Sequence, residues 1–312
     1  MSNVEVLVSG ATGFVGKSLC GEMRNVNLRT IGRSPSCIEE VRHFSGFFDR
    51  KDDFRTALEG VEVVIHLAGR AHNFGESEKA GSRLHDLVNH QGTLQFADQA
   101  REMGVKQFIF LSSAKVNGEF SQPDASFTQD DEPNPVGAYA QSKLKAELGL
   151  IRAHRGSSMD VVIIRPPLVY GSEVGGNFKS MVDWVRKGYP FPDVNAAEKR
   201  SFVFVENLVD FIIFCIGNKN ASNQIFMVSD GDSYTTTELV SKIAAVLGKK
   251  IKMIKLPYKL LKTIASLFGK SQAIEKLFGS LEVDITDTCK ILGWSPPFDV
   301  DEALRKTLTR EE

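Results

Sequence analysis

Tyrosine and lysine stand four positions apart at Tyr139 and Lys143, within residues 138–148, a run without a helix breaker. Residues four apart share one face of a helix, so the phenol and the ammonium would point the same way. A neighbouring cation favours tyrosinate, so we expect a lowered pKa for Tyr139, which could then accept or donate a proton. Because this spacing also arises by chance, it indicates chemistry only if the chain brings a cofactor and a substrate beside the pair.

Length and composition limit the classes of protein to consider. The 312 residues suffice for one large domain or two closely joined domains, and the net charge of −1 gives no sign of a nucleic-acid partner. The four cysteines show neither metal-ligand spacing nor a paired pattern, so we expect reduced thiols and no metal site. The N-terminus lacks a signal-peptide pattern and the most apolar run is too short to span a bilayer. We therefore expect a cytoplasmic protein.

A strand, a glycine turn and a helix follow one another at the start of the chain. Residues 4–8 predict a β-branched strand, and residues 10–16 read Gly-Ala-Thr-Gly-Phe-Val-Gly before a helical pattern. This order is typical of a loop that binds a dinucleotide. Gly10 would allow the tight turn, Gly13 the approach of a pyrophosphate to the helix N-terminus, and Gly16 the packing of helix on strand. The alternative is an ordinary glycine-rich turn.

The end of the second predicted strand bears on the choice between NAD and NADP. Residues 28–31 predict this strand, and Gly32 and Arg33 follow where an NAD-preferring site usually places an acid. An arginine there can accept a 2′-phosphate, which slightly favours NADP, whereas a solvated loop arginine is the alternative. Residues 47–49 predict a third strand ending in Asp49, an acid that could meet the adenine amino group.

Strands and helices continue to alternate along the chain. Residues 61–69 form an apolar run typical of a buried parallel strand, and we interpret His66 within it as structural rather than as a base. Residues 84–103 predict a long helix that carries Asn89.

A further strand, residues 107–111, delivers Ser113 near its carboxyl end, where open α/β sheets bind ligands. Residues 160–165 predict another buried strand, followed by two prolines. The alternation predicts an α/β fold, a Rossmann-type doubly wound parallel sheet with a smaller, mostly helical substrate-binding region on the C-terminal side. We assign the Rossmann domain to residues 1–170, completed by about 202–230, and the substrate-binding region to residues 171–201 and 231–312.

A series of motifs in this order resembles the extended short-chain dehydrogenase/reductases, the nucleotide-sugar epimerase/dehydratase group with its UDP-hexose 4-epimerase-like members. Each motif is weak alone, but the series covers nearly the whole chain. The motifs are Gly10-Ala11-Thr12-Gly13-Phe14-Val15-Gly16, His66-Leu67-Ala68, Asn89, Ser112-Ser113, Tyr139-Ala140-Gln141-Ser142-Lys143 and Arg165-Pro166-Pro167-Leu168-Val169-Tyr170-Gly171.

The resemblance implies a role for each matching residue. Tyr139 would be the acid/base at a sugar hydroxyl, Ser113 would hydrogen-bond the same oxygen, and Lys143 would hold the nicotinamide ribose. Arg200 matches the arginine that grips the substrate diphosphate, a task that suits a bidentate guanidinium, although a surface cation is the alternative. The residues predicted to bind the cofactor are Gly10, Thr12, Gly13, Phe14, Val15, Gly16, Arg33, Asp49, Leu67, Ala68, Asn89, Tyr139, Lys143 and Pro166. Those predicted to bind the substrate are Ser113, Asn177 and Arg200.

Departures from the family pattern narrow the reaction. Residues 114–115 after Ser113 are Ala-Lys where dehydratases place Asp-Glu, so dehydration lacks its acid and base. Asn117 replaces a tyrosine of the pattern, which puts in doubt any role given to that tyrosine. Leu168 replaces an asparagine, and Asn177 could supply the missing contact.

The run Ser-Ser-x-Lys-Val-Asn-Gly resembles bacterial enzymes of surface-polysaccharide pathways, both 4-epimerases and reductases. We predict an NAD(P)-dependent nucleotide-sugar 4-epimerase acting on a UDP-hexose or UDP-N-acetylhexosamine through a 4-keto intermediate. The alternative is an NADPH-dependent reductase of a UDP-4-keto-6-deoxy-hexose, which Arg33 favours. A non-catalytic NADP-binding sensor or scaffold is a second alternative, although such proteins lose the tyrosine and lysine. The family resemblance also implies a homodimer.

Residues 249–276 lie outside these motifs and interleave lysines with apolar residues. We hypothesise that this basic amphipathic segment makes weak contact with a membrane surface or a lipid-linked sugar. Helices that cover the substrate with a solvated lysine face are the alternative. The residues that carry the pattern are Lys250, Lys252, Lys255, Lys259, Lys262 and Lys270, with Leu260, Leu261, Ile264, Leu267 and Phe268.

Overall fold

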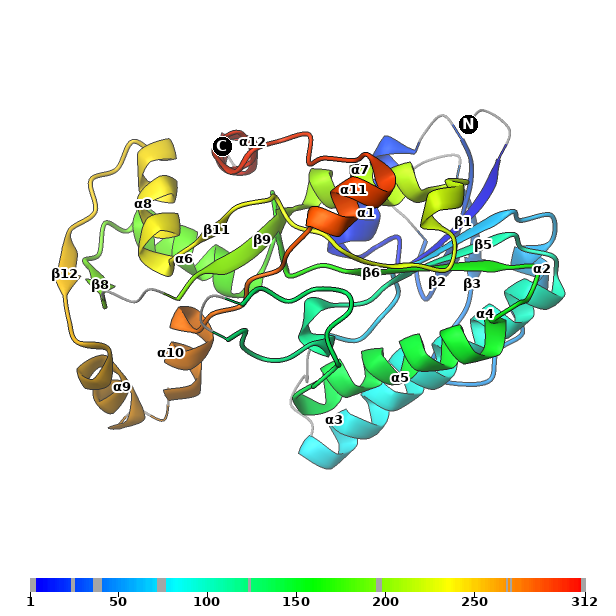
Figure 1. Ribbon diagram of the computed structural model, residues 1–312, viewed down its shortest axis with the longest axis horizontal. Helices are drawn as coiled ribbons and strands as arrows, with labels where there is room; N and C mark the ends of the chain where they lie inside the picture. Colours follow the sequence, from blue (N-terminus) through cyan, green and yellow to red (C-terminus); the bar gives the residue numbers. More distant parts are fainter. Residues whose placement is uncertain are drawn as a thin grey trace.

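A seven-stranded parallel sheet forms the centre of the computed structural model, with strand order β10-β6-β5-β4-β1-β2-β3 (Figure 1). This confirms the predicted Rossmann-type doubly wound sheet. The strands are β1 (Glu5–Ser9), β2 (Asn27–Gly32), β3 (Arg42–Ser45), β4 (Val63–His66), β5 (Gln107–Leu111), β6 (Asp160–Arg165) and β10 (Ile225–Met227). The structure describes residues 4–23, 26–35, 41–71, 77–122, 125–194, 198–267, 269 and 271–309.

Helices cover both faces of this sheet, which is why its strands are nearly continuous apolar runs. Val6 and Val8 of β1 face one core, while Leu7 between them faces the other. The first core lies under α1 (Phe14–Glu22), α7 (Val205–Cys215) and α11 (Thr286–Leu292) (Figure 1). The second lies under α2 (Arg55–Leu58), α4 (Gly92–Glu102) and α5 (Gly137–His154).

The long helix predicted at residues 84–103 is present but begins earlier and is interrupted. It runs through α3 (Glu78–His85), a π-helical turn η1 (Asp86–Gln91) and α4. The π turn carries Asn89, and such turns are frequent at functional sites.

The third predicted strand was wrong. β3 pairs with β2 through residues 42–45, whereas residues 47–49 lie outside the strand and enter a turn at residues 48–51. Phe48 is drawn into the core, where it stacks on Phe54 at 5.2 Å between ring centroids. The Asp52 carboxylate accepts the backbone N–H of Phe47 at 2.8 Å and fixes the turn. The two phenylalanines that predicted a strand therefore lie at a turn.

The smaller region contains two short sheets and several helices, in agreement with a mostly helical C-terminal side. One sheet has the order β11-β9-β7, and β12 pairs with β8. A third core cluster joins these strands to the helices, with Phe178, Phe204, Val240 and Leu304 among its buried members. The elements are β7 (Leu168–Tyr170), α6 (Gly176–Arg186), β8 (Phe191–Asp193), β9 (Arg200–Phe204), β11 (Ser233–Tyr234), α8 (Thr236–Val246), β12 (Met253–Lys255), α9 (Tyr258–Leu267), α10 (Ser271–Phe278) and α12 (Val300–Thr309), with 3-10 turns η2 (Ala114–Val116) and η3 (Lys219–Ala221).

Two further expectations from the sequence concern the state of the cysteines and the lengths of the apolar helices. Cys20, Cys215 and Cys289 are free thiols, and Cys37 lies outside the described residues. In the described part of the chain, no helix combines the length and apolarity needed to cross a membrane.

Candidate functional site

The glycine loop lies between the carboxyl end of β1 and the first turn of α1. Gly10 has φ +76°, and a Cβ there would lie 2.6 Å from the backbone nitrogen of Ala68. A Cβ on Gly16 would lie 2.1 Å from the carbonyl oxygen of Gly10, so any side chain would separate helix from strand. The Gly13 N–H closes the turn on the Gly10 carbonyl at 3.0 Å. Thr12 and Gly13 are exposed at the tip, ahead of the helix N-terminus that favours an anion.

This loop fits the pyrophosphate of a dinucleotide. It lies at the carboxyl ends of β1 and β4, where the strand order reverses, which is the ligand position in doubly wound sheets. Phe14 and Val15 are half-buried and pack against the core of the smaller region, so the glycine loop lies beside that region. Arg33 is exposed just past the carboxyl end of β2, and Asp49 is exposed in the turn after β3.

His66 fixes the end of β4 beside the glycine loop. Its ring nitrogens bond the hydroxyls of Ser9, at 2.7 Å, and Thr93, at 2.9 Å. Burial, with a contribution from the Lys143 charge, lowers the pKa of His66 to about 3, so the ring stays neutral. Ser9 in turn accepts the backbone N–H of Ala68 at 3.2 Å. The structural interpretation of His66 is confirmed, since one nitrogen holds, through Ser9, the loop that begins at Leu67, and the other joins β4 to Thr93 of α4.

Asn89 joins the loop after β4 to the helix that carries the tyrosine. Its amide nitrogen donates to the carbonyl of Arg70, at 2.9 Å, and to Ser142 Oγ, at 3.0 Å, while its oxygen accepts the Arg70 N–H at 2.7 Å. The backbone at Gly69 passes directly beside Lys143 and Asn89. Asn89 therefore supports the site from the π turn.

Tyr139 sits on the first turn of α5, where a hydrogen bond joins its hydroxyl to that of Ser113 at the end of β5. The ring keeps part of its surface accessible, although protein surrounds the hydroxyl. Burial raises the pKa of Tyr139, and the Ser113 hydrogen bond acts in the opposite direction. The His85 ring, which sequence reasoning missed, contacts the Tyr139 ring edge-on at 6.0 Å.

Lys143 lies one helical turn further along α5 and is buried. Its ammonium donates to the Leu111 carbonyl at 2.8 Å and lies 4.5 Å from the centre of the Phe110 ring. Burial lowers the pKa of Lys143 to about 8, with the Glu147 charge opposing the shift. The expected lowering of the Tyr139 pKa by this lysine was wrong: desolvation of the phenol dominates, and the ammonium is directed at a backbone carbonyl.

A buried ion pair behind Lys143 was also missed by sequence reasoning. Arg165 at the end of β6 binds the Glu147 carboxylate through Nη2 at 2.6 Å and through Nε, with the two side chains 3% and 1% exposed. Ser112 donates to the same carboxylate, and Arg165 Nη1 donates to Asn117 Oδ1 at 3.0 Å. Glu147 lies two helical turns after Tyr139, and this spacing could have indicated that its side chain lies on the same face of the helix as Tyr139. The network locks α5 to the ends of β5 and β6.

Asn117 and Pro166 make further hydrogen bonds that hold the segment around Ser113. Asn117 also donates to the Thr128 carbonyl at 2.8 Å, so the residue that departs from the family pattern is a buried structural bridge. The Pro166 carbonyl accepts the backbone N–H of Ala114 at 2.9 Å. These contacts hold the segment that presents the serine hydroxyl.

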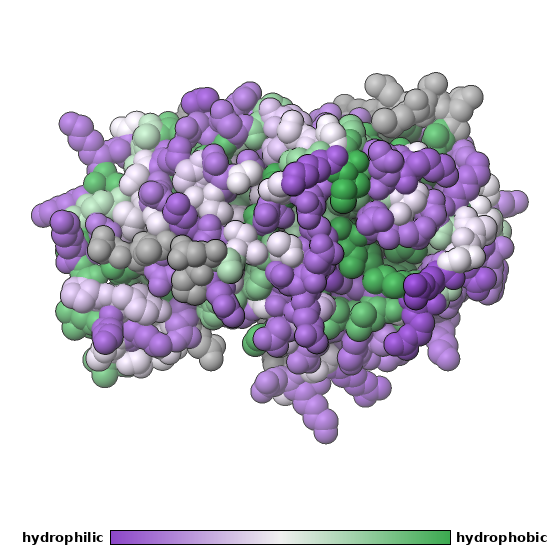
Figure 2. All heavy atoms as spheres, viewed as in Figure 1, coloured by the Kyte–Doolittle hydropathy of each residue, from purple (hydrophilic) through white to green (hydrophobic). Residues whose placement is uncertain are grey.

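The two substrate-side predictions lie in the smaller region. Arg200 opens β9 and donates to the Gly279 carbonyl at 2.6 Å. Arg200 is half-buried and is therefore not a free surface cation. This burial lowers the pKa of Arg200, and the Glu119 charge raises it. Asn177 is exposed in the first turn of α6. The outline of the molecule is indented between the part that carries α9 and α10 and the end that carries α3 (Figures 1 and 2).

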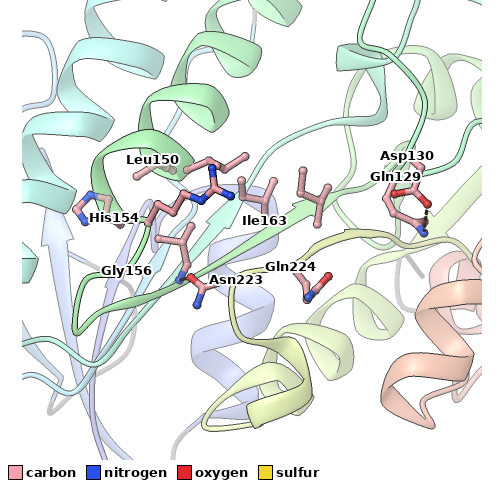
Figure 3. A pocket seen from close by; sticks show the side chains of 12 residues that line it. Gln129, Asp130, Leu150, His154, Gly156, Ile163, Asn223 and Gln224 are labelled. Atoms are coloured by element: carbon pink, nitrogen blue, oxygen red, sulfur yellow. Dashed lines mark hydrogen bonds between the residues drawn. The ribbon is translucent and has the colours of Figure 1, made fainter.

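A pocket of about 540 Å³ lies elsewhere, along the second half of α5 and beside β6 and β10. Figure 3 shows Leu150 and Ile163 between His154 on one side and Gln129 on the other. Leu150 is eleven residues beyond Tyr139, which is about 16 Å along a helix. This pocket is therefore separate from the tyrosine and the serine.

Comparison with known proteins identifies the family. Residues 6–229 match the NAD dependent epimerase/dehydratase family. The chain belongs to this family. It is 38% identical to a UDP-glucose 4-epimerase of Vibrio cholerae over 311 residues, covering 97% of this chain and 94% of the relative. It is 27% identical, over 99% of this chain and 96% of the relative, to the N-acetyl-alpha-D-glucosaminyl-diphospho-ditrans,octacis-undecaprenol 4-epimerase of Escherichia coli O157:H7.

Solved structures share the fold. MoeE5 in complex with UDP-glucuronic acid and NAD superposes with a TM-score of 0.79 at 21% identity, over 98% of this chain and 99% of that one. Together with the family match, this confirms the predicted family, an NAD(P)-dependent enzyme and the Rossmann-type fold.

Proposed function

We propose that the protein is an NAD(P)-dependent nucleotide-sugar 4-epimerase that acts on a UDP-hexose or a UDP-N-acetylhexosamine. The observation that carries this proposal is the hydrogen-bonded pair of Ser113 and Tyr139, with Lys143 buried beside them at the carboxyl end of the parallel sheet. The 38% identity to a UDP-glucose 4-epimerase supports it.

In this proposal a bound nicotinamide, held by the glycine loop and Lys143, would supply a reversible acceptor for the hydride at carbon 4 of the sugar. Tyr139, as the tyrosinate, takes the proton of the 4-hydroxyl group and becomes the phenol, which gives the proton back after the 4-keto sugar has turned in the site. Ser113 holds the same sugar oxygen and, through its bond to Tyr139, favours the tyrosinate that the first half needs. Lys143 orients the ribose of the cofactor, and Arg200 holds the diphosphate of the substrate.

The segment after Ser113 supports epimerisation rather than dehydration. Ala114 is buried, and the Lys115 ammonium lies 3.7 Å from the Glu119 carboxylate. Neither position carries a carboxyl group, so the Asp-Glu pair that a dehydratase places after the serine is absent at residues 114–115. A 4-keto sugar formed here would therefore keep its 6-hydroxyl and await reduction at the same carbon.

Reduction of a UDP-4-keto-6-deoxy-hexose by NADPH is the second candidate. Arg33 favours it, since it lies exposed at the end of β2 where it could meet a 2′-phosphate. Incubation of the pure protein with UDP-N-acetylglucosamine or UDP-glucose, without added cofactor, separates the two. The 4-epimer as product supports the epimerase; no epimer, together with NADPH oxidation by a 4-keto sugar, contradicts it and supports the reductase.

We also propose a cytoplasmic homodimer that uses the outer face of α5. Leu148 and Ile151 are 50% and 41% exposed on this helix, and Ile151 also lines the pocket along α5. Charged substitution of both residues should convert the dimer into a monomer in analytical ultracentrifugation. An unchanged sedimentation coefficient would contradict this interface.

A further inference from the structure

Helix α9 presents apolar side chains on two opposite faces. Its inner face carries Tyr258 and Leu261, which pack against the core of the smaller region, and Ala265, which is 8% exposed. Tyr258 approaches the buried Phe278 of α10 with 6.5 Å between ring centroids. This face packs α9 onto the core of the smaller region.

The outer face of α9 is apolar and exposed. Leu260, Ile264 and Leu267 follow the i, i+4, i+7 spacing of a single stripe, and their exposed fractions are 48%, 42% and 80%. Ile254 on the neighbouring strand β12 is 45% exposed. Figure 2 shows apolar side chains at the surface at the lower left of the molecule, where Figure 1 places α9. Single exposed leucines are ordinary, but an aligned stripe opposite the packed face indicates a docking surface.

The charged residues around this stripe are nearly all lysines. Residues 249–276 contain eight lysines and one glutamate, in a chain whose net charge is −1. That glutamate, Glu275, pairs with Lys262 on α9. Lys255 and Lys259 are exposed, close in sequence to Leu260. Phe268 and Lys270 of the predicted basic segment lie outside the described residues. An apolar stripe flanked by lysines complements a surface that is apolar within and anionic at its edge.

We propose that the outer face of α9 docks on an anionic bilayer surface, with Leu260, Ile264 and Leu267 at the acyl boundary and the lysines among the headgroups. A second copy of the chain fits the stripe less well, since it would set lysine-rich segments against each other. α10 packs on α9 and ends beside Gly279, whose carbonyl binds Arg200. Docking would therefore bring the side of the molecule that carries Arg200 close to the bilayer.

Flotation with vesicles tests this docking directly. We expect the full chain to float at low salt with phosphatidylcholine vesicles that contain phosphatidylglycerol, and about 10-fold less with pure phosphatidylcholine. The triple variant Leu260→Ser, Ile264→Ser, Leu267→Ser should lose about 10-fold in binding. Ile291→Ser is the matched control, because Ile291 is 43% exposed on α11.

Three outcomes would overturn the proposal: no flotation of the wild type at low salt, equal binding to neutral and anionic vesicles, or unchanged binding of the triple variant. Sedimentation of the triple variant adds a further test, because dissociation of an oligomer would assign the stripe to a second copy. Circular dichroism of each variant shows that it is folded. The proposal rests on the exposed stripe and its lysines, so failure of the proposed sugar chemistry would leave it standing.

Discussion

The two sides of the candidate site are built differently. On the sheet side, His66, Asn89 and Glu147 are buried and each is held by several hydrogen bonds. On the side of the smaller region, Arg200 is half-buried against a backbone carbonyl and Asn177 is exposed. We infer that the sheet side sets the reacting geometry in advance, whereas the smaller region sets which substrate is held. Changes on the first side should alter turnover or folding, and changes on the second should alter substrate affinity.

The largest expected effect is the loss of the tyrosine hydroxyl. Tyr139→Phe removes one oxygen from the Ser113 pair, so turnover should fall about 1,000-fold while the dinucleotide still binds. Turnover assays and calorimetric titration with NAD and NADP measure the two effects. Tyr189→Phe is the matched control, since Tyr189 is 51% exposed in the smaller region. Wild-type turnover in Tyr139→Phe would remove the tyrosine from the chemistry.

The next largest effect concerns the buried ion pair. Glu147→Gln leaves the Arg165 guanidinium without its counter-charge, so the free energy of unfolding should fall by about 3–5 kcal/mol. Denaturant titration measures this change, and Glu59→Gln on the surface should leave it unaltered. Equal stability of the two variants would show that the network does not fix α5 to the sheet.

A smaller effect should distinguish the substrate side. Arg200→Lys keeps the charge but loses bidentate geometry, so KM for the UDP-sugar should rise about 10-fold with kcat nearly unchanged. Arg305→Lys, an exposed position on α12, is the control. A fall in kcat at unchanged KM would contradict this role and would indicate that Arg200 sets the reacting geometry, as Tyr139 does.

The smallest effect is a dependence on pH. Because burial lowers the pKa of Lys143 to about 8, the ammonium predominates below that pH and is lost above it. If the charged form orients the cofactor, kcat/KM should decline as pH rises through about 8. A pH–rate profile measures this limb, which Lys143→Arg should shift out of range. A flat profile through pH 9 would argue against a role for the ammonium.

Much of the sheet side could be predicted from the chain alone because its signals are local. The glycine spacing at Gly10 and Gly16, and the four-residue interval between Tyr139 and Lys143, specify their own geometry. The third strand was misplaced because the paired phenylalanines at residues 47–48 are typical of a strand. In the structure a turn directs Phe48 into the core.

What could not be predicted depends on contacts between distant residues. Arg165 meets Glu147 across eighteen positions, and Arg200 meets the Gly279 carbonyl across seventy-nine. No local pattern encodes either pairing. The direction of the Tyr139 pKa shift likewise depends on how deeply α5 is buried, which the spacing of its residues does not determine.

The proposed epimerisation requires that hydride leaves and returns to the same sugar carbon while Tyr139 carries the proton. It is tested most directly with UDP-glucose or UDP-N-acetylglucosamine deuterated at carbon 4, followed by NMR. Our account predicts that the 4-epimer forms without added cofactor and retains its deuterium at carbon 4. Hydrogen from solvent at that carbon, or no epimer from either sugar, would contradict it.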